Sequence, residues 1–247
     1  MEARNPRKCF VLCAHIVQQT LRDLTEWVGQ VQKGSSAAGY VSAKDVALKM
    51  RIDYSRGIRD QTAKNLEALC GLCWKLERPD FNPDTFIQET ADLISKLFAI
   101  ESVAIGVRDP VDKLYKYRTV VGLDKEVADG YKSLTYTREQ LLEPKTYPSY
   151  EVSHHTRVFL AEEHPYAPGE EFTYRRPGLI GMKRRTLTDS LEADYMDFLF
   201  YGPDGDIMGF IETSGTRMRK LPDIATIRWI ELFASVLGAA LQKKRAF

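Results

Sequence analysis

Two apolar runs joined by a turn near residue 200 constrain the fold more than any other feature of the sequence. Residues 195–201 and 207–213 are rich in aromatic and aliphatic side chains, and residues 202–206 between them read Gly-Pro-Asp-Gly-Asp. Glycine, proline and aspartate are the residues that tight turns prefer. The pattern predicts a β-hairpin, and therefore an antiparallel sheet in this part of the chain.

A long amphipathic helix is predicted directly after this hairpin. It follows Pro222 and Asp223 and ends in the basic run 243–245, where positive charge suits the helix dipole. Its apolar face comprises Ile224, Ile227, Ile230, Phe233, Val236, Leu237, Ala240 and Leu241. Another amphipathic helix is predicted from about Pro83, so a helix stands at each end of this part of the chain.

A first hairpin and an irregular middle segment lie between these elements. Residues 102–107 are largely apolar, residues 109–112 have turn chemistry, and residues 113–121 alternate as a partner strand would. Residues 123–190 lose this periodicity and hold six of the twelve tyrosines and three of the four histidines. We expect long loops and short helices there.

Three of these segments resemble the GAF domain, a PAS-like sensor family. Residues 195–213 are similar to the family's closing hairpin, in which the second strand contains an internal glycine. Residues 221–241 resemble its terminal helix, and residues 117–123 resemble its second strand with the Gly-Leu that follows. The resemblance implies an α+β fold with an antiparallel sheet flanked by helices, the first and last helices on one face and a small-molecule pocket on the other.

The sequence predicts two parts, a helical segment at residues 1–78 and the GAF-like domain at residues 80–247. Apolar spacings of three and four over residues 14–31 indicate a helix with one apolar seam, and residues 33–39 read as a loop. A further helical region at 43–76 ends in a seam of Leu66, Leu69, Cys73 and Leu76. We expect the first part to dimerise the chain or to contact a partner.

Charge and hydropathy restrict the classes of partner that the chain is expected to bind. With 35 Lys and Arg against 34 Asp and Glu, the chain lacks the positive field that nucleic acid binding usually requires. This disfavours a helix-turn-helix reading of residues 42–59, for which an ordinary packing helix is the alternative. No run reaches the roughly 18 apolar residues of a membrane span. We expect a cytoplasmic protein without a membrane partner.

The four cysteines, Cys9, Cys13, Cys70 and Cys73, permit a second hypothesis. A C-x-x-C and a C-x-x-x-C could form a zinc site or a redox switch on the helical segment. Packing is the alternative, since reduced cysteine is often buried. A few GAF-like proteins reduce methionine sulfoxide with cysteines inside the domain, but here every cysteine precedes residue 80. This argues against that activity.

Candidate ligand-binding residues are tyrosine, histidine, arginine and glutamate side chains of the GAF-like domain. Tyrosine offers a flat ring with one polar tip, histidine is a common metal ligand, and arginine binds phosphate. The alternatives are aromatic packing, solvated loops and chance charge placement. The candidates are Tyr117, Tyr131, Tyr136, Tyr150, His154, His155, Arg184, Tyr201 and Glu212.

The leading functional hypothesis is a sensory or regulatory protein that binds a small-molecule ligand and signals through its helices. The sequence contains no kinase, cyclase, phosphodiesterase or response-regulator motif, so we expect no catalytic output and a downstream signalling protein as partner. The sequence identifies no cofactor.

Overall fold

The computed structural model describes residues 46–47, 49–50 and 60–245. The chain divides into two compact units, Met1–Gly57 and Ile58–Phe247. The predicted helix at 14–31, the loop at 33–39 and most of the pattern at 42–59 lie outside the described residues. The fold below is that of the second unit.

A seven-stranded antiparallel sheet forms the centre of this unit. Its strands are β1 (Ile100–Arg108), β2 (Tyr115–Val121), β3 (Thr135–Tyr136), β4 (Tyr150–Glu151), β5 (Thr156–Phe159), β6 (Tyr195–Tyr201) and β7 (Ile207–Thr216). Their order across the sheet is β3-β2-β1-β7-β6-β5-β4. The two predicted hairpins, β1–β2 and β6–β7, are both present and antiparallel. The central pair β1–β7 joins them into one sheet.

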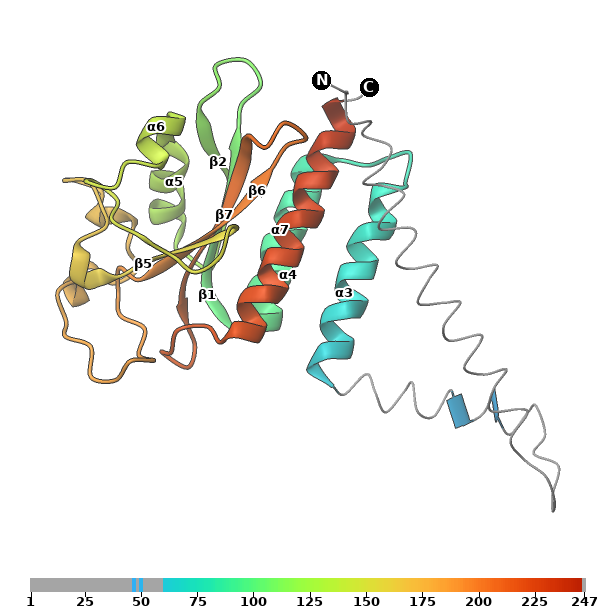
Figure 1. Ribbon diagram of the computed structural model, residues 1–247, viewed down its shortest axis with the longest axis horizontal. Coiled ribbons are helices and arrows are strands. Elements are labelled where there is room, and N and C mark those ends of the chain that lie inside the picture. The colour runs from blue at the N-terminus through green and yellow to red at the C-terminus, as the bar shows by residue number, and fades with distance from the viewer. Residues whose placement is uncertain (1–45, 48, 51–59, 246–247) are drawn as a thin grey trace. The chain divides into compact units, whose positions relative to one another are not determined.

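Two helices cover one face of the sheet, as Figure 1 shows. They are α4 (Pro83–Phe98) and α7 (Ile224–Arg245), the helices predicted at the two ends of the domain. Asn82 caps α4 by accepting hydrogen bonds from the backbone N–H groups of Asp84 and Thr85 at 2.9 and 3.1 Å. The largest core cluster lies between these helices and side chains such as Ile105, Phe198 and Ile211.

α7 is long and apolar enough to cross a membrane, by length and composition alone. Its apolar residues Ile230, Phe233 and Leu237 are fully buried in the core cluster of this domain. Packing against the sheet therefore accounts for the apolar character of α7.

The helix that precedes α4 belongs to the same compact unit. α3 (Gln61–Leu76) contacts both α4 and α7, and Leu69, Leu72 and Leu76 are buried in the same core cluster. The unit therefore begins before the predicted boundary at residues 78–80, because burial of these leucines joins α3 to the domain.

The apolar seam predicted for this helix is wrong at one position. Leu66 is 53% exposed, and Leu72 occupies the buried place next to Leu69 and Leu76. Cys73, which the seam included, is half-buried.

The middle segment lies over the opposite face of the sheet. It contains α5 (Lys125–Ser133), α6 (Arg138–Leu141) and the short 3₁₀ helices η1 (Ala161–Glu163), η2 (Glu171–Thr173) and η3 (Pro177–Leu179). A second core cluster gathers there around Tyr115, Tyr117, Tyr131 and Phe210. The sheet therefore separates two cores, one made with helices and one made with loops and tyrosines.

Candidate functional site

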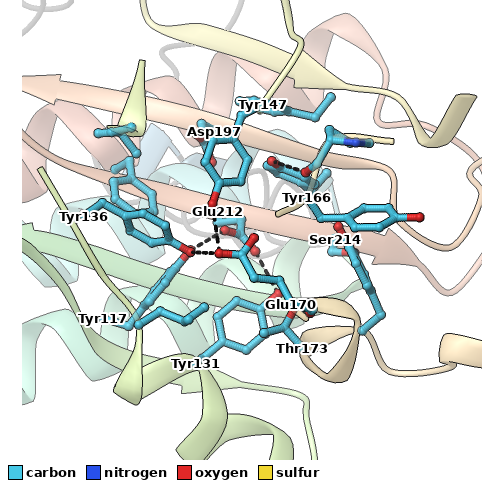
Figure 2. Close-up of a pocket in the computed structure, with 17 residues that line it drawn as sticks. Tyr117, Tyr131, Tyr136, Tyr147, Tyr166, Glu170, Thr173, Asp197, Glu212 and Ser214 are labelled. Carbon is cyan, nitrogen blue, oxygen red and sulfur yellow. Dashed lines mark hydrogen bonds between the residues drawn. The ribbon is translucent and has the colours of Figure 1, made fainter. Parts of the chain in front are cut away.

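A cavity lies on the loop-covered face of the sheet, shown in Figure 2. Its volume is about 50 Å³. Eleven of its 17 lining residues come from residues 123–190, and the other six come from β2, β6 and β7. The irregular segment of the sequence is thus the roof of the cavity, and the sheet is its floor.

Tyrosines and carboxylates dominate the lining. The seven tyrosines are Tyr117, Tyr131, Tyr136, Tyr147, Tyr166, Tyr174 and Tyr195, and the three carboxylates are Glu170, Asp197 and Glu212. None of the 17 lining residues, all within the described part of the chain, is Lys, Arg or His. The cavity is therefore aromatic and acidic.

Glu212 is the acidic residue at the centre of the floor. It lies on β7 and is 9% exposed. Its Oε2 accepts a hydrogen bond from the Tyr117 hydroxyl at 2.6 Å, and its Oε1 accepts one from the Tyr131 hydroxyl at 2.9 Å. The rings of the two tyrosines meet edge to face at 5.1 Å. Strand β2 and helix α5 are thus joined through one carboxylate.

Asp197 lies directly across from Glu212 in the β6–β7 hairpin. Strand partners project to the same face of a sheet, so both carboxylates face the cavity. Arg157, the partner of Asp197 on β5, donates from Nη2 to Asp197 Oδ2 at 2.9 Å. Asp197 is only 3% exposed, and its Oδ1 is buried without a hydrogen-bond partner among the described residues.

Burial changes the acidity of this pair. Burial raises the pKa of Glu212 to about 7, the charge of Asp197 acts in the same direction, and the two tyrosine hydroxyls oppose it. Burial also raises the pKa of Asp197 to about 6, although Arg157 opposes the change. The pKa values of Tyr117 and Tyr131 are raised well above their ordinary value, first by burial and then by the charge of Glu212. The two phenols therefore act as neutral donors.

The third carboxylate, Glu170, holds the roof together. Its Oε1 accepts hydrogen bonds from Tyr147 at 2.8 Å and Tyr136 at 3.4 Å, and its Oε2 accepts one from the backbone N–H of Ala167 at 2.9 Å. From the floor, the Tyr195 hydroxyl donates to the carbonyl oxygen of Pro165 at 3.0 Å. The loop around η2 is therefore tied to both β3 and β6.

Four of the candidates from the sequence line this cavity. They are Tyr117, Tyr131, Tyr136 and Glu212. The structure brings them together from β2, α5, β3 and β7, although they are spread over nearly a hundred residues of sequence.

Three other candidates gather at a different place. The His154 ring stacks on Tyr201 at 5.0 Å, and the Tyr201 hydroxyl donates to the His154 carbonyl oxygen at 2.9 Å. His155 lies next to them, with Nδ1 at 3.2 Å from the Leu199 carbonyl oxygen. These contacts fasten the turn before β5 to the end of β6, outside the cavity lining.

The remaining two candidates, Tyr150 and Arg184, also lie outside the lining. Tyr150 is 51% exposed and donates to Glu163 at 2.9 Å. Arg184 Nη2 donates to Glu162 and Asp194 at 2.9 and 2.8 Å. Its guanidinium is thus held between two carboxylates, and its contacts fix the loop to η1 and to the residue that precedes β6.

The cysteine hypothesis concerns another part of the chain. Cys70 is exposed and Cys73 is half-buried on α3, whereas Cys9 and Cys13 lie outside the described residues. The described ranges contain no group of three or more His, Cys, Asp or Glu side chains placed to hold a metal ion. A switch that uses all four cysteines stays a prediction.

Sequence reasoning missed Asp197, Glu170 and most of the cavity tyrosines. A partial signal for Asp197 was present, because the apolar runs at 195–201 and 207–213 carry one carboxylate each. Counting outward from the turn places Asp197 opposite Ile211, and the register shift between Phe200 and Tyr201 brings it opposite Glu212 instead. The sequence shows no sign of this shift, so it does not predict the pairing of the two acids. Glu170 had no such signal, since no periodicity surrounds it.

The sheet is antiparallel, with α4 and α7 on one face and a loop-covered cavity on the other. This arrangement defines the class of fold to which the domain belongs. The domain has the GAF-like α+β fold that the sequence resemblance implied. No family model matches the chain, and no curated protein matches it either.

The chain is similar to several solved structures of GAF domains. The GAF domain/HD domain protein from Geobacter sulfurreducens is 13% identical over 72% of this chain and 99% of that chain, with a TM-score of 0.50. The GAF domain of an Acinetobacter phosphoenolpyruvate-protein phosphotransferase is 11% identical over 73% and 94%, with a TM-score of 0.49. The GAF domain of a putative sensor histidine kinase from Pseudomonas syringae pv. tomato is 15% identical over 80% and 94%, with a TM-score of 0.46. At these identities the Geobacter structure supports the fold alone.

Proposed function

We propose that the domain is a sensory module that binds a small molecule in the tyrosine-lined cavity. The observation that supports this most is the cavity itself, with two buried carboxylates on its floor. Ligand sites are concave and mostly apolar, with a few convergent polar groups whose pKa values are perturbed.

The sheet offers a direct route from the cavity to the helices. On β7, Phe210 belongs to the cluster on the cavity side, and its neighbour Ile211 belongs to the cluster of α4 and α7. A displacement of β7 by a ligand therefore changes the packing of both helices. A ligand shifts such an equilibrium only by its difference in affinity for the two states.

The proposed output runs through α7 and α3. The Lys243 ammonium at the end of α7 donates to the Leu76 carbonyl oxygen at the end of α3 and lies 3.6 Å from Glu77. Movement of α7 thus reaches the helix that connects to the N-terminal segment. The proposal includes a homodimer, a downstream signalling protein, a cytoplasmic location and no catalytic step in this chain.

Native mass spectrometry of protein purified from its own host tests the ligand. We expect an extra mass under native conditions that disappears on denaturation. Leu134 is half-buried and lines the cavity, whereas Leu142, 37% exposed, lies outside the lining. Leu134→Trp should therefore abolish the extra mass, whereas Leu142→Trp should retain it.

Two results would contradict the proposal. An extra mass that persists in Leu134→Trp places the molecule elsewhere on the chain. A bare protein that takes up no small molecule from a host extract favours a partner-binding domain instead.

A further inference from the structure

We propose that the ligand is a small organic cation, a protonated amine of a few non-hydrogen atoms, held by Asp197 and Glu212 among the tyrosine rings. This inference rests on the proposed function, because it assigns a chemical class to the ligand of the same cavity.

The charges around the cavity favour a cation. Among the described residues, Glu212 has only the neutral hydroxyls of Tyr117 and Tyr131 as hydrogen-bond partners, and Arg157 forms its ion pair with Asp197 alone. Glu170 adds another carboxylate from the roof. A buried charge without a counterion costs free energy, and a bound cation supplies the missing charge.

One carboxylate oxygen of Asp197 is unsatisfied within the described part of the chain. Arg157 donates to Oδ2, and Oδ1 is buried with no hydrogen-bond partner among the residues that the structure describes. The residue lines the cavity. Buried polar atoms are almost always satisfied in folded proteins. Arg157 Nε is buried without a partner among these residues as well and makes no hydrogen bond to Oδ1. An N–H group of a ligand in the cavity would supply the donor that this oxygen lacks.

Aromatic rings form much of the cavity wall. The Tyr117 ring meets Tyr131 at 5.1 Å and Tyr136 at 6.3 Å, and the Tyr195 ring stacks on Phe159 at 4.2 Å. Aromatic faces attract cations within about 6 Å of the ring centre. Anions, including phosphates, meet three carboxylates and no basic lining residue in this described part of the chain.

The size of the cavity selects the probes. The cavity volume of about 50 Å³ is small, although it exceeds the roughly 10–15 Å³ that one water molecule requires, so the probes have only a few non-hydrogen atoms. Isopropylammonium has four non-hydrogen atoms and one positive charge. 2-Propanol is its neutral counterpart of the same shape, and acetate is an anion of the same size.

Isothermal titration calorimetry of the full chain with these three probes tests the inference. Such small probes bind weakly, so millimolar concentrations are used. We expect isopropylammonium to bind at least tenfold more tightly than 2-propanol, and acetate to show no binding. Affinity for the cation should rise from about pH 5 to pH 8 as Asp197 and Glu212 ionise, since their pKa values are about 6 and about 7. Glu170 and the cavity tyrosines line the same cavity, and Arg157 is paired with Asp197 beside it, so these groups are present in every measurement.

Two variants test whether Asp197 and Glu212 bind the cation. Asp197→Asn should weaken isopropylammonium binding at least tenfold and leave 2-propanol binding unchanged. Glu212→Gln should weaken it in the same direction, and its amide can still bond to both Tyr117 and Tyr131, so the fold is retained. Asp204→Asn removes an exposed carboxylate of the β6–β7 turn and should change nothing.

The outcomes separate the two proposals. If 2-propanol binds as tightly as isopropylammonium, or if Glu212→Gln and Asp197→Asn both leave cation binding unchanged, the cation inference is overturned and the ligand-binding function stands. If no probe binds and the protein from its host carries no extra mass, both are overturned.

Discussion

Glu212 and Asp197 couple the stability of the domain to pH. Both carboxyls have pKa values in the folded domain above those of the unfolded chain, about 7 against 4.5 for Glu212 and about 6 against 3.8 for Asp197. A raised pKa means that the folded state holds protons which the unfolded state has already released. The contribution of these groups to stability therefore falls as pH rises from about 4 to about 7.

Glu212→Gln tests this coupling, because an amide does not ionise. We expect the difference in unfolding free energy, variant minus wild type, to be more positive at pH 8 than at pH 5. The difference should be on the order of 1–3 kcal/mol, since one pKa unit corresponds to about 1.4 kcal/mol. Urea unfolding at the two pH values measures it. Asp204→Asn serves as the control and should keep the pH profile of the wild type; an identical profile for Glu212→Gln would refute the coupling.

Single residues of the site were only partly predictable. Tyr117 and Glu212 lie on strands whose pattern is visible in the sequence, and both line the cavity. Tyr147, Tyr166 and Tyr174 lie in loops, where no periodicity tells which side chains turn inward. His154 and Tyr201 were grouped with the candidates for their chemistry, but their contacts with each other lie outside the cavity.

At the scale of elements, the glycine inside β7 shows how tightly the central strands pack. A Cβ at Gly209 would lie 2.3 Å from the Gly106 carbonyl oxygen and 2.4 Å from the Phe200 ring. Gly106 and Phe200 belong to the two strands that flank β7. The internal glycine of the closing hairpin is therefore required by its neighbours on both sides.

Gly209→Ala should destabilise the domain by about 1–3 kcal/mol, the usual range for overpacking in a core. Gly178→Ala is the matched control, because nothing lies within 4 Å of a Cβ at that position. Its effect should stay within about 0.5 kcal/mol. Thermal unfolding of both variants checks this. Equal melting temperatures for the two would mean that the strands can move apart without cost.

The elements with strong periodicity were predicted well, and the short ones were not. β1, β2, β6, β7, α4 and α7 follow the expected ranges closely. β3, β4 and β5 have two to four residues, too few to show an alternation. β5 matters most among these, because it places Arg157 beside Asp197.

At the scale of the whole molecule, two roles are expected for residues 1–78. α3 stabilises the domain core, and the residues before it are proposed to dimerise the chain. Removal of residues 1–59 leaves α3 in place, so this shortened chain is the reference for the unfolding free energy of the domain. Removal of residues 1–78 also removes Leu69, Leu72 and Leu76 from the core. It should cost several kcal/mol, because each buried leucine contributes about 1.5–3 kcal/mol. Chemical denaturation of the two shortened chains measures the difference.

The same two chains test the proposed dimer. In sedimentation equilibrium we expect both shortened chains to be monomers and the full chain to be a dimer. A chain lacking residues 1–78 that keeps the full oligomeric state would exclude the N-terminal segment from dimerisation.

The ends of the sheet have a consequence for behaviour in a crowded solution. The edge strands β3 and β4 contain two residues each, whereas the interior strands β1 and β7 contain nine and ten. Open backbone N–H and C=O groups along a long edge invite another chain to add a strand, and very short edge strands remove that template. The folded domain is thereby protected from growing into β-aggregates, even though its central strands are among the most apolar parts of the chain.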